Sequence, residues 1–420
     1  MEHESTKDQL SRRGFLGIGS AALAAAAGSL AVSSAVAQGN PSAKARTDQS
    51  ATDPGPANPA LDPQNPDSAW PPGTDSKSLV QTFKYPFSFA NKRTYEGGWS
   101  REVTVRELAV SKSLAGVNMR LTAGGVRELH WHTADEWAIV LYGSARITAI
   151  DRDGKSFVAD VKKNDLWYFP SGIPHSIQGL DPDGTEFMLV FDDGDFSESE
   201  TVLLSDSMAH LPREVLSKNF GIPELAFKNL PKQELFIFQT AVPGSLEEDQ
   251  RAAAGSHGKS QVDFAFRTME MPPTKRTKGG EVRIVDSSTF KASTNVAMAM
   301  VTVHPGGMRE LHWHPNADEW QYYISGKARM TVVSTGNRAR TMDFQEGDVG
   351  YVEKTLLHYI ENTGDTDLIF LEMFKSSFYQ DLSLSEWLAH TPPELVKAHL
   401  KIDQATLDAI PRDELVIVPR

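Results

Sequence analysis

A six-residue phrase occurs twice in this chain of 420 residues. Residues 127–132 and residues 309–314 both read Arg-Glu-Leu-His-Trp-His, each copy follows a glycine pair, and each is followed within a few residues by Glu-Trp. A further histidine recurs at nearly the same interval. Motifs that repeat in the same order at a near-constant spacing indicate an internal duplication, so we predict two copies of one domain.

The repeated phrase supplies metal-binding residue types on one face of a strand. Side chains alternate across a strand, so histidines two positions apart point to the same side. A glutamate four or five residues later can return to that side after a bend, and the distant histidine has to arrive from a neighbouring strand. Three imidazoles and one carboxylate can hold a first-row transition metal and leave the open positions that a catalytic metal requires. The predicted ligands are His130, His132, Glu136 and His175 in the first half and His312, His314, Glu319 and His358 in the second.

Composition narrows the class of partner. The formal net charge is −13, and the sequence contains no stripe of lysine or arginine. Both observations argue against nucleic acid as a partner. An anionic substrate would therefore have to be attracted by local cations. The chain has no cysteine, so disulfides and thiolate ligands are excluded and stability must come from the core.

The amino terminus resembles an export signal. Residues 11–17 read Ser-Arg-Arg-Gly-Phe-Leu-Gly and precede a mildly apolar, alanine-rich stretch that ends at Ala35-Val36-Ala37. Paired arginines before such a stretch and a small-x-small cleavage site are typical of twin-arginine signals. We predict that residues 1–37 are this signal and that the mature protein is periplasmic or secreted, with no stable membrane span. The alternative is an uncleaved anchor, which the glycines, serines and alanines disfavour.

The remainder is predicted to be β-rich. Residues 38–78 are rich in Pro, Asn, Asp, Ser and Ala and indicate a flexible tail. Beyond them, short apolar runs alternate with turn residues at roughly ten-residue intervals, as in an all-β sandwich or barrel. We predict an N-terminal domain at 79–242, a linker at 243–260 and a C-terminal domain at 261–420. Predicted strands include 136–141, 145–150, 166–169 and 186–191, with a helix at 207–216 and two helices within 384–400, the second opening at 391–394.

The ligand sets lie in motifs that resemble those of the cupin superfamily. The first motif combines a glycine, His-x-His, a glutamate and a second glycine, and it is met by Gly124 to Gly143 and again by Gly306 to Gly326. The second motif is met in part. The N-terminal half keeps its proline and glycine at Pro170 and Gly172, whereas Glu353 and Thr355 replace them in the C-terminal half. These departures affect turn geometry and leave the ligands intact.

More specific stretches resemble the bacterial oxalate decarboxylases, which are duplicated cupins (bicupins). They are Asp-Leu-Trp-Tyr-Phe-Pro at 165–170, residues 319–331 and residues 191–198, and the resemblance runs from about residue 80 to the end. It implies two tandem cupin jelly-roll β-barrels with short flanking helices and one Mn²⁺ in each. It also implies a reaction that converts oxalate and a proton into formate and carbon dioxide, with dioxygen required but not consumed, in a homo-oligomer that is a trimer or hexamer. The same ligands would also hold iron, zinc or copper, so the metal stays open.

The resemblance also implies roles around the metals. Arg127, three residues before His130, would orient and polarise the bound substrate through a charge-assisted bond, and Arg309 is its second-site equivalent. The family moves a proton with a glutamate on a flexible lid over the first site, which assigns that acid to Glu198. The family lid commonly reads Ser-Glu-Asn-Ser-Thr, so Ser199 and Glu200 depart from it. The second half has no equivalent lid, and Glu372 is the candidate acid there.

Several alternatives remain open. The departures in the lid leave room for an oxalate oxidase, which would release carbon dioxide and hydrogen peroxide. A binding or storage bicupin typically loses ligands, and none is lost here. A dioxygenase that acts on sugars or aromatic compounds is disfavoured by the arginine beside each His-x-His. The second metal is expected to be structural or auxiliary. Trp131 and Trp313 should face away from their metals and serve in packing, with an electron relay between subunits as the alternative.

Overall fold

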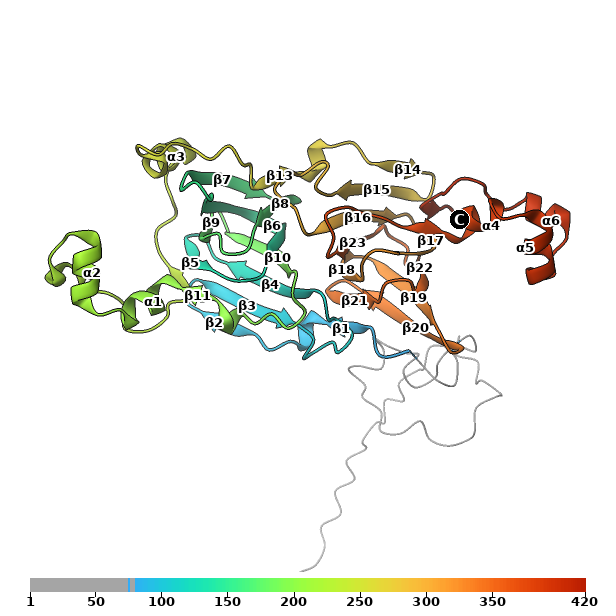
Figure 1. Cartoon of the computed structure of the whole chain (residues 1–420), viewed down its shortest axis with the longest axis horizontal. Helices are drawn as coiled ribbons and strands as arrows, with labels where there is room; N and C mark the ends of the chain where they lie inside the picture. The colour runs from blue at the N-terminus through green and yellow to red at the C-terminus, as the bar shows by residue number, and fades with distance from the viewer. Residues whose placement is uncertain (1–74, 76–79) are drawn as a thin grey trace, which may run out of the picture. The chain divides into compact units, whose positions relative to one another are not determined.

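The computed structural model describes Asp75 and residues 80–420. The predicted signal at 1–37 lies outside these residues, as does the predicted tail apart from Asp75. The described chain forms two β-barrels of antiparallel strands, the first mainly in blue to green and the second in gold to red in Figure 1. The all-β fold class and the duplication that the repeated phrase predicts are confirmed.

The first barrel contains the strands that carry the first ligand set. Its strands are β2 (Arg93–Tyr95), β3 (Gly98–Val103), β4 (Ala115–Leu121), β5 (Gly125–Trp131), β6 (Glu136–Ile150), β7 (Ser156–Lys162), β8 (Asp165–Phe169), β9 (His175–Gly179), β10 (Thr185–Phe191), β11 (Val202–Leu203) and β12 (Ile237–Gln239). The main path through its sheet is β11-β5-β9-β6-β10-β4-β3-β2. The two strands predicted at 136–141 and 145–150 form the single strand β6, because β10 pairs with it up to Gly143 and β7 pairs with it from Ser144 onward.

The second barrel repeats this pattern. Its strands are β14 (Lys275–Thr277), β15 (Gly280–Val285), β16 (Ala297–Val303), β17 (Met308–Trp313), β18 (Glu319–Ser325), β19 (Lys327–Ser334), β20 (Arg338–Gln345), β21 (Asp348–Val352), β22 (Leu357–Asn362), β23 (Leu368–Phe374), β24 (Leu382–Ser383) and β25 (Ile417–Val418). Here Gly326 separates β18 from β19. The ligand-bearing strand β17 pairs with β22, β24 and β25, as β5 pairs with β9, β11 and β12.

Each barrel completes a sheet with a strand from the other half of the chain. Strand β1 (Lys84–Pro86) pairs with β21, and β13 (Ala265–Arg267) pairs with β8 (Figure 1). The boundaries drawn at residues 79 and 261 stay predictions, but these two strands pair outside the domain to which the sequence assigned them. The first exchange is fixed by a buried ion pair between Lys84 Nζ and Asp348 Oδ2 at 2.9 Å.

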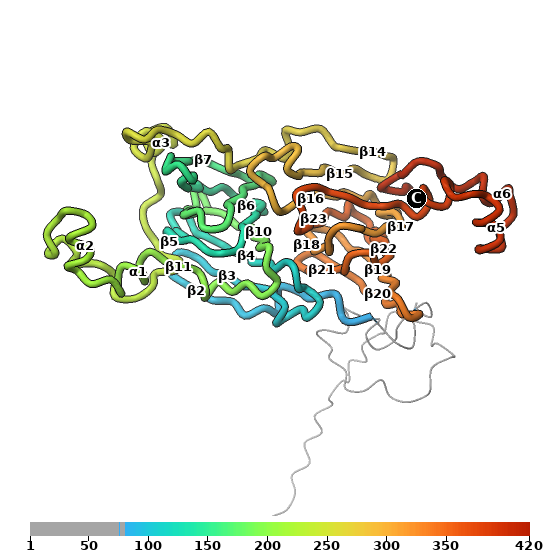
Figure 2. Tube along the Cα trace, in the orientation of Figure 1, coloured from blue at the N-terminus to red at the C-terminus, as the bar shows by residue number. Residues whose placement is uncertain are grey.

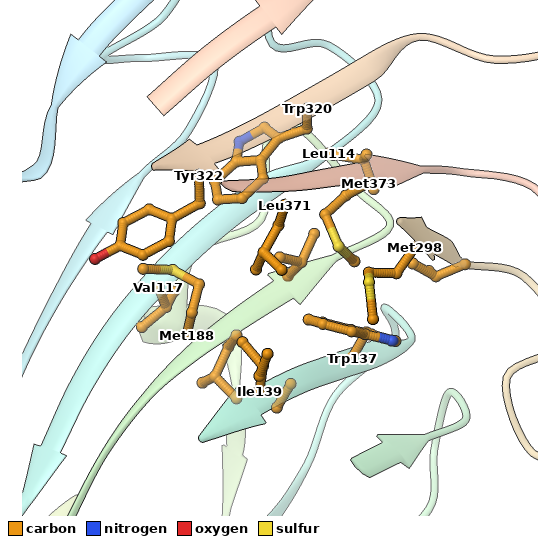
Figure 3. Packing of buried hydrophobic residues seen from close by; sticks show 14 of the residues in the cluster. Leu114, Val117, Trp137, Ile139, Met188, Met298, Trp320, Tyr322, Leu371 and Met373 are labelled. Carbon is orange, nitrogen blue, oxygen red and sulfur yellow. The ribbon is translucent and has the colours of Figure 1, made fainter. Parts of the chain in front are cut away.

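The two barrels share one hydrophobic core. Figure 3 shows Trp137 and Ile139 of β6 among side chains of the second barrel that include Trp320 and Leu371. Trp137 and Trp320 are fully buried, and each directly follows the glutamate of its ligand set. Alternation along the strand explains this arrangement, because a ligand that points into the barrel places its neighbour on the outer face, where the other barrel covers it.

Short helices flank the barrels. They are α1 (Leu204–His210), α2 (Arg213–Phe220), α3 (Leu246–Ala254), α4 (Leu384–Ala389), α5 (Pro393–Leu400) and α6 (Gln404–Asp408), with the single turns η3 (Phe87–Phe89), η4 (Glu198–Glu200), η5 (Glu224–Phe227) and η6 (Thr268–Glu270). The single helix predicted at 207–216 is wrong: Pro212 lacks an N–H and holds Leu211 extended, so the chain forms α1 and α2 instead. The two helices predicted within 384–400 are present.

The predicted linker at 243–260 contains a helix that the sequence analysis missed. The chain leaves β12, forms α3 and continues to β13. Figure 2 shows α3 beside β7. The side chain of Ser245 accepts a hydrogen bond from the Glu248 N–H, which caps the start of α3. In the described part of the chain, no helix is both long enough and apolar enough to cross a membrane.

Candidate metal centres and lid

The first predicted ligand set forms a buried cluster inside the first barrel. His130 near the end of β5 lies directly opposite His175, the first residue of β9. His132 follows β5, and Glu136 opens β6. Glu136 Oε2 lies 3.2 Å from His132 Nε2 and 3.3 Å from His175 Nε2. One ligand atom from each of the four side chains lies within 4.8 Å of the others, so they could hold one ion.

The second set, His312, His314, Glu319 and His358, repeats this geometry within the same limit of 4.8 Å. His312 lies opposite His358 across β17 and β22. Glu319 Oε2 lies 2.7 Å from His358 Nε2 and 3.1 Å from His314 Nε2. The structure therefore brings together all eight residues that the sequence predicts as ligands.

Backbone carbonyls fix the orientation of each imidazole. In the first cluster, the Nδ1 atoms of His130, His132 and His175 lie 2.6–2.7 Å from the carbonyl oxygens of Glu128, Ala134 and Ile173. The second cluster has the same kind of contact, at 2.6–2.9 Å. Since a carbonyl oxygen only accepts, Nδ1 carries a proton, and Nε2 is the atom left to ligate an ion at the centre of the cluster, as in protein metal sites.

The electrostatics of both clusters suit a cation. Burial, reinforced by the neighbouring arginine, lowers the pKa of His130 and His312 well below the usual range, so both imidazoles are neutral. Burial alone would raise the pKa of Glu136 and Glu319, but the adjacent histidines outweigh it and hold these pKa values well below the usual range. His312 Nε2 is buried without a hydrogen-bond partner among the described residues. A divalent ion would satisfy this atom, so the residues present fit a metal.

The outer oxygen of each ligating glutamate is held by a different donor. In the first barrel Trp167 Nε1 donates to Glu136 Oε1 at 2.8 Å. In the second, Gln321 Nε2 donates to Glu319 Oε1 at 2.7 Å, and Tyr323 donates to Gln321 at 2.9 Å. The predicted stretches contained these residues without a role for them. Such donors orient a ligand and tune its affinity for the metal.

Arg127 is a buried cation whose charge is not matched by an ion pair with any described residue. Its guanidinium lies 4.0 Å from the centre of the Phe236 ring, and Nη1 donates to the Phe236 carbonyl at 3.3 Å. Within residues 80–420 no carboxylate lies at ion-pair distance from it. Burial lowers its pKa from the usual value, and the charge of Glu198 is the largest opposing influence. An anion that reached this arginine would therefore meet an available positive charge.

Glu198 closes the first site. It opens the turn η4, and its side chain is 2% exposed. Phe196, two residues earlier, stacks on Phe191 at 3.6 Å between ring centres. The cavity that Glu198 shares with Arg127 and the metal ligands measures about 10 Å³, roughly the room that one water molecule requires. The lid is closed, and a substrate can reach the metal only if this segment moves.

Arg309 has the opposite surroundings. It is fully buried, with Nε 3.2 Å from Glu372 Oε1, and it forms a second ion pair with Asp381. Its Nη2 also donates to the Tyr379 hydroxyl at 2.7 Å. Burial alone would lower the pKa of Arg309, but its acidic neighbours raise it well above the usual value. Burial raises the pKa of Glu372 to about 7, opposed by Arg309. Two carboxylates thus already match this arginine.

Two residues that hold these arginines gave no signal in the sequence. Phe236 and Val416 have φ values of 56° and 61°, and their carbonyls accept from Arg127 and Arg309 respectively. The same carbonyls accept from the N–H groups of Glu128 and Glu310. A positive φ is rare for bulky or β-branched residues and marks a conformation imposed by the surroundings, often at functional sites.

The tryptophans of the repeated phrase lie away from the clusters. Trp131 and Trp313 are half-buried, in contrast to the buried histidines on either side of them. Trp313 packs edge to face against Trp387, with 5.8 Å between ring centres. These positions suit the predicted packing role, and an electron relay between subunits stays an untested hypothesis.

The fold and the two clusters define the class of protein: a two-barrel cupin with a His₃Glu site in each barrel. The protein-family model described as Cupin matches residues 87–224 and again residues 267–408. Oxalate decarboxylase OxdC of Bacillus subtilis is 50% identical over 375 residues, which cover 89% of this chain and 96% of OxdC. A probable oxalate decarboxylase of Arthroderma benhamiae is 39% identical over 368 residues, which cover 87% of this chain and 90% of that protein.

Solved structures agree. The structure of the Bacillus subtilis oxalate decarboxylase at pH 4.6 superposes with a TM-score of 0.85 at 50% identity, covering 89% of this chain and 97% of that one. A study of the Mn(II) centres of the same enzyme gives a match with the same score and identity, covering 98% of that chain. The chain belongs to the bicupin oxalate decarboxylase family of the cupin superfamily.

Proposed function

We propose that this chain is a manganese-dependent oxalate decarboxylase that converts oxalate and a proton into formate and carbon dioxide, with dioxygen as a cofactor that is not consumed. One observation carries the proposal: a buried arginine without an ion-pair partner in the described part of the chain and an acid on a closed lid line the same cavity as the ligands of the first cluster. Identity of 50% to OxdC across nearly the whole chain supports the choice of substrate.

We propose Mn²⁺ in both clusters, held by the eight histidine and glutamate ligands. The support is the nitrogen and oxygen donor set and the Mn(II) centres of the related enzyme. When bound, the metal would supply a Lewis acid that polarises a carboxylate oxygen of the substrate. Iron, zinc and copper are compatible with the same ligands, so metal analysis of the purified protein and activity after reloading with each ion distinguish them.

The side chains around the first cluster have two tasks in this reaction. Arg127 binds a carboxylate of oxalate through charge-assisted hydrogen bonds and holds the dianion in place. When the bond between the two carbons breaks, one carboxylate leaves as carbon dioxide and the remaining carbon needs a proton. Glu198 lines the same small cavity, which supports its assignment as the donor of that proton. While it is closed, the lid also shields the cavity, which has room for about one water molecule, from bulk solvent.

The second cluster is proposed as an auxiliary metal site. Arg309 is already paired with Glu372 and Asp381, so an oxalate would have to displace buried carboxylates in order to reach it. Glu372 is therefore the ion-pair partner of Arg309, and its role as an acid stays a prediction.

The competing function is oxalate oxidation on the same scaffold, and a specific observation keeps it in view. The lid carries Ser199 and Glu200, where the family lid commonly has Asn and Ser. Both reactions begin from bound oxalate, and they differ in whether the remaining carbon is protonated or loses further electrons to dioxygen. The two products therefore need to be measured together.

The test uses the chain from about Gln38, produced with manganese and supplied with oxalate under air at mildly acidic pH. Formate near one per oxalate with little peroxide is expected. Mostly peroxide would assign the protein as an oxidase and implicate Ser199 and Glu200. Neither product, with both metal sites filled, would contradict the proposal.

We also propose export and self-association. The paired Arg12 and Arg13 before an apolar stretch support a twin-arginine signal, and replacing both with lysine should block export of the full chain. A homo-oligomer, trimer or hexamer, is supported by large apolar side chains exposed on the flanking helices, among them Leu225, Trp387 and Leu395. Light scattering of the metal-loaded protein measures its assembly, and a monomer would contradict this part.

A further inference from the structure

The closed lid is held by Arg93, a residue to which no role has been assigned so far. Arg93 of β2 contacts two consecutive lid residues. Its Nη2 lies 2.7 Å from Glu198 Oε2, and its Nη1 donates to Ser199 Oγ at 3.2 Å. Both arms of one planar guanidinium therefore bind the lid, which fixes its position more narrowly than a single contact would.

Arg93 is itself held in place from the barrel. Its Nη2 lies 3.5 Å from Glu102 Oε2, and its guanidinium lies 5.2 Å from the centre of the Phe236 ring. Glu102 also accepts a hydrogen bond from the Glu198 N–H at 3.2 Å. The pair formed by Arg93 and Glu102 thus binds both the side chain and the backbone of Glu198. Phe236 also contacts Arg127, which links the lid to the substrate side of the cavity.

This arrangement governs access to the metal. The cavity behind Glu198 has room for about one water molecule, so oxalate can enter only after the lid opens. A lid that moved Glu198 and Ser199 away from β2 would break both contacts of Arg93. The side chain of Arg93 is 26% exposed, whereas that of Glu198 is 2% exposed, so the arginine lies at the boundary between solvent and the closed site.

We propose that Arg93 is a positioning residue that latches the lid through Glu198 and Ser199, and that its strength sets the partition between decarboxylation and oxidation. The inference rests on the proposed function. With the lid closed, Glu198 protonates the carbon that remains after carbon dioxide leaves, and formate forms. With the lid open, that proton is not delivered, and the carbon passes its electrons to dioxygen. Per oxalate, two electrons and two protons then convert one dioxygen into hydrogen peroxide and leave two molecules of carbon dioxide.

In this proposal Ser199 provides the second contact between the lid and Arg93. Its hydroxyl accepts from Arg93 at the position where the family lid commonly has asparagine. The departure that raises the question of oxidase activity therefore supplies the second contact of the latch. Removing that hydroxyl should increase lid opening, as removing the guanidinium should, but by a smaller amount.

The experiment compares Arg93→Gln, Arg93→Lys and Ser199→Ala with the unchanged protein, all full length and loaded with manganese. Arg276→Gln is the matched control, because Arg276 is an exposed arginine of the second barrel that is also paired with a glutamate. Hydrogen exchange at residues 195–203 without substrate measures lid opening, and peroxide per formate measures the partition. We expect Arg93→Gln to raise both by about tenfold, the scale of one lost charge-assisted hydrogen bond. Arg93→Lys and Ser199→Ala should fall between, with metal content unchanged.

Two results would overturn the proposal. Lid exchange in Arg93→Gln equal to that of the unchanged protein would show that Arg93 is no latch. Faster exchange with an unchanged product ratio would show that the latch does not set the partition. If Arg93→Gln fails to fold, Ser199→Ala carries the same two readings. If the unchanged protein forms neither formate nor peroxide, the proposed function fails, while the exchange measurement still decides whether Arg93 latches the lid.

Discussion

Arg127 and Arg309 occupy the same position in two copies of one barrel, yet they differ in what neutralises them. Arg127 contacts an aromatic ring and a carbonyl and has no ion-pair partner within residues 80–420, whereas Arg309 is bound by two carboxylates and a tyrosine. The ligands are identical in type and arrangement. The comparison teaches that the duplication conserved the ligand set, while residues outside the repeated phrase decided which of the two arginines is paired with carboxylates.

The same contrast appears around the ligating glutamates. Trp167 pairs across the strands with Ala138, and in the second barrel Gly350 pairs with Gln321. A large donor faces a small residue each time, but the donor comes from opposite strands. At Gly350 an added Cβ would lie 2.4 Å from Gln321 Oε1, so a larger residue there would displace the Gln321 side chain. In each barrel one large side chain donates to the outer oxygen of the ligating glutamate. The donor lies on β8 in the first barrel and on β18 in the second.

The largest expected effect separates the two arginines. Arg127→Met should lower kcat/KM for oxalate by about 10²–10³-fold, the scale of a lost electrostatic contact to the reacting group, with little change in stability. Arg309→Met leaves buried carboxylates unpaired and should destabilise the fold by about 3–5 kcal/mol. Steady-state kinetics and chemical denaturation of both variants test this. Equal effects of the two substitutions on both quantities would remove the distinction between the sites.

A second prediction addresses the donors to the glutamates. Trp167→Phe frees Glu136 Oε1 and should weaken metal binding at the first site by about 10–100-fold, leaving the second unchanged. Gln321→Leu should do the reverse. Competition with a chelator, followed by counting the retained ions, measures both affinities. Each variant serves as the control for the other, and loss of both ions together in either variant would contradict independent sites.

The smallest expected effect concerns pH. Burial, reinforced by Asp381, raises the pKa of Glu414 from 4.5 to about 7, whereas its counterpart Glu234 is exposed. The folded protein therefore holds this proton more tightly than the unfolded chain. The resulting stability is complete below pH 4.5 and is lost as pH rises to about 7, by at most about 3 kcal/mol. Glu414→Gln should flatten the dependence of Tm on pH over this window, and Glu234→Gln should leave it unchanged. A steeper dependence in Glu414→Gln would be contrary to this reading.

The sequence predicted what is local and repeated. His130 and His132 share a strand face by alternation, and the duplication located their partners and the second set. Contacts that depend on distant segments could not be read in this way. The pairing of β1 with β21 joins the start of the described chain to the second barrel, and nothing in Lys84–Pro86 indicates that partner. Phe236 and Val416 take a backbone conformation opposed to their own preferences, so only the fold reveals them.

The lid shows the same difference between what local sequence predicts and what only the fold reveals. Glu198 could be assigned from the resemblance of its segment, but its latch could not. Arg93 lies 105 positions earlier in the chain and has no motif of its own. Strand register was likewise needed to show that Trp167 faces the small residue Ala138, and that Gln321 faces Gly350.

The most direct test of the central difference between the two clusters is the stoichiometry of oxalate binding. Calorimetric titration of the manganese-loaded protein without dioxygen, in which turnover is not expected, counts the sites that accept the dianion. We predict one oxalate per chain, lost in Arg127→Met. Two oxalates per chain, or one that persists in Arg127→Met, would contradict the conclusion that the unmatched arginine of the first barrel defines the substrate site.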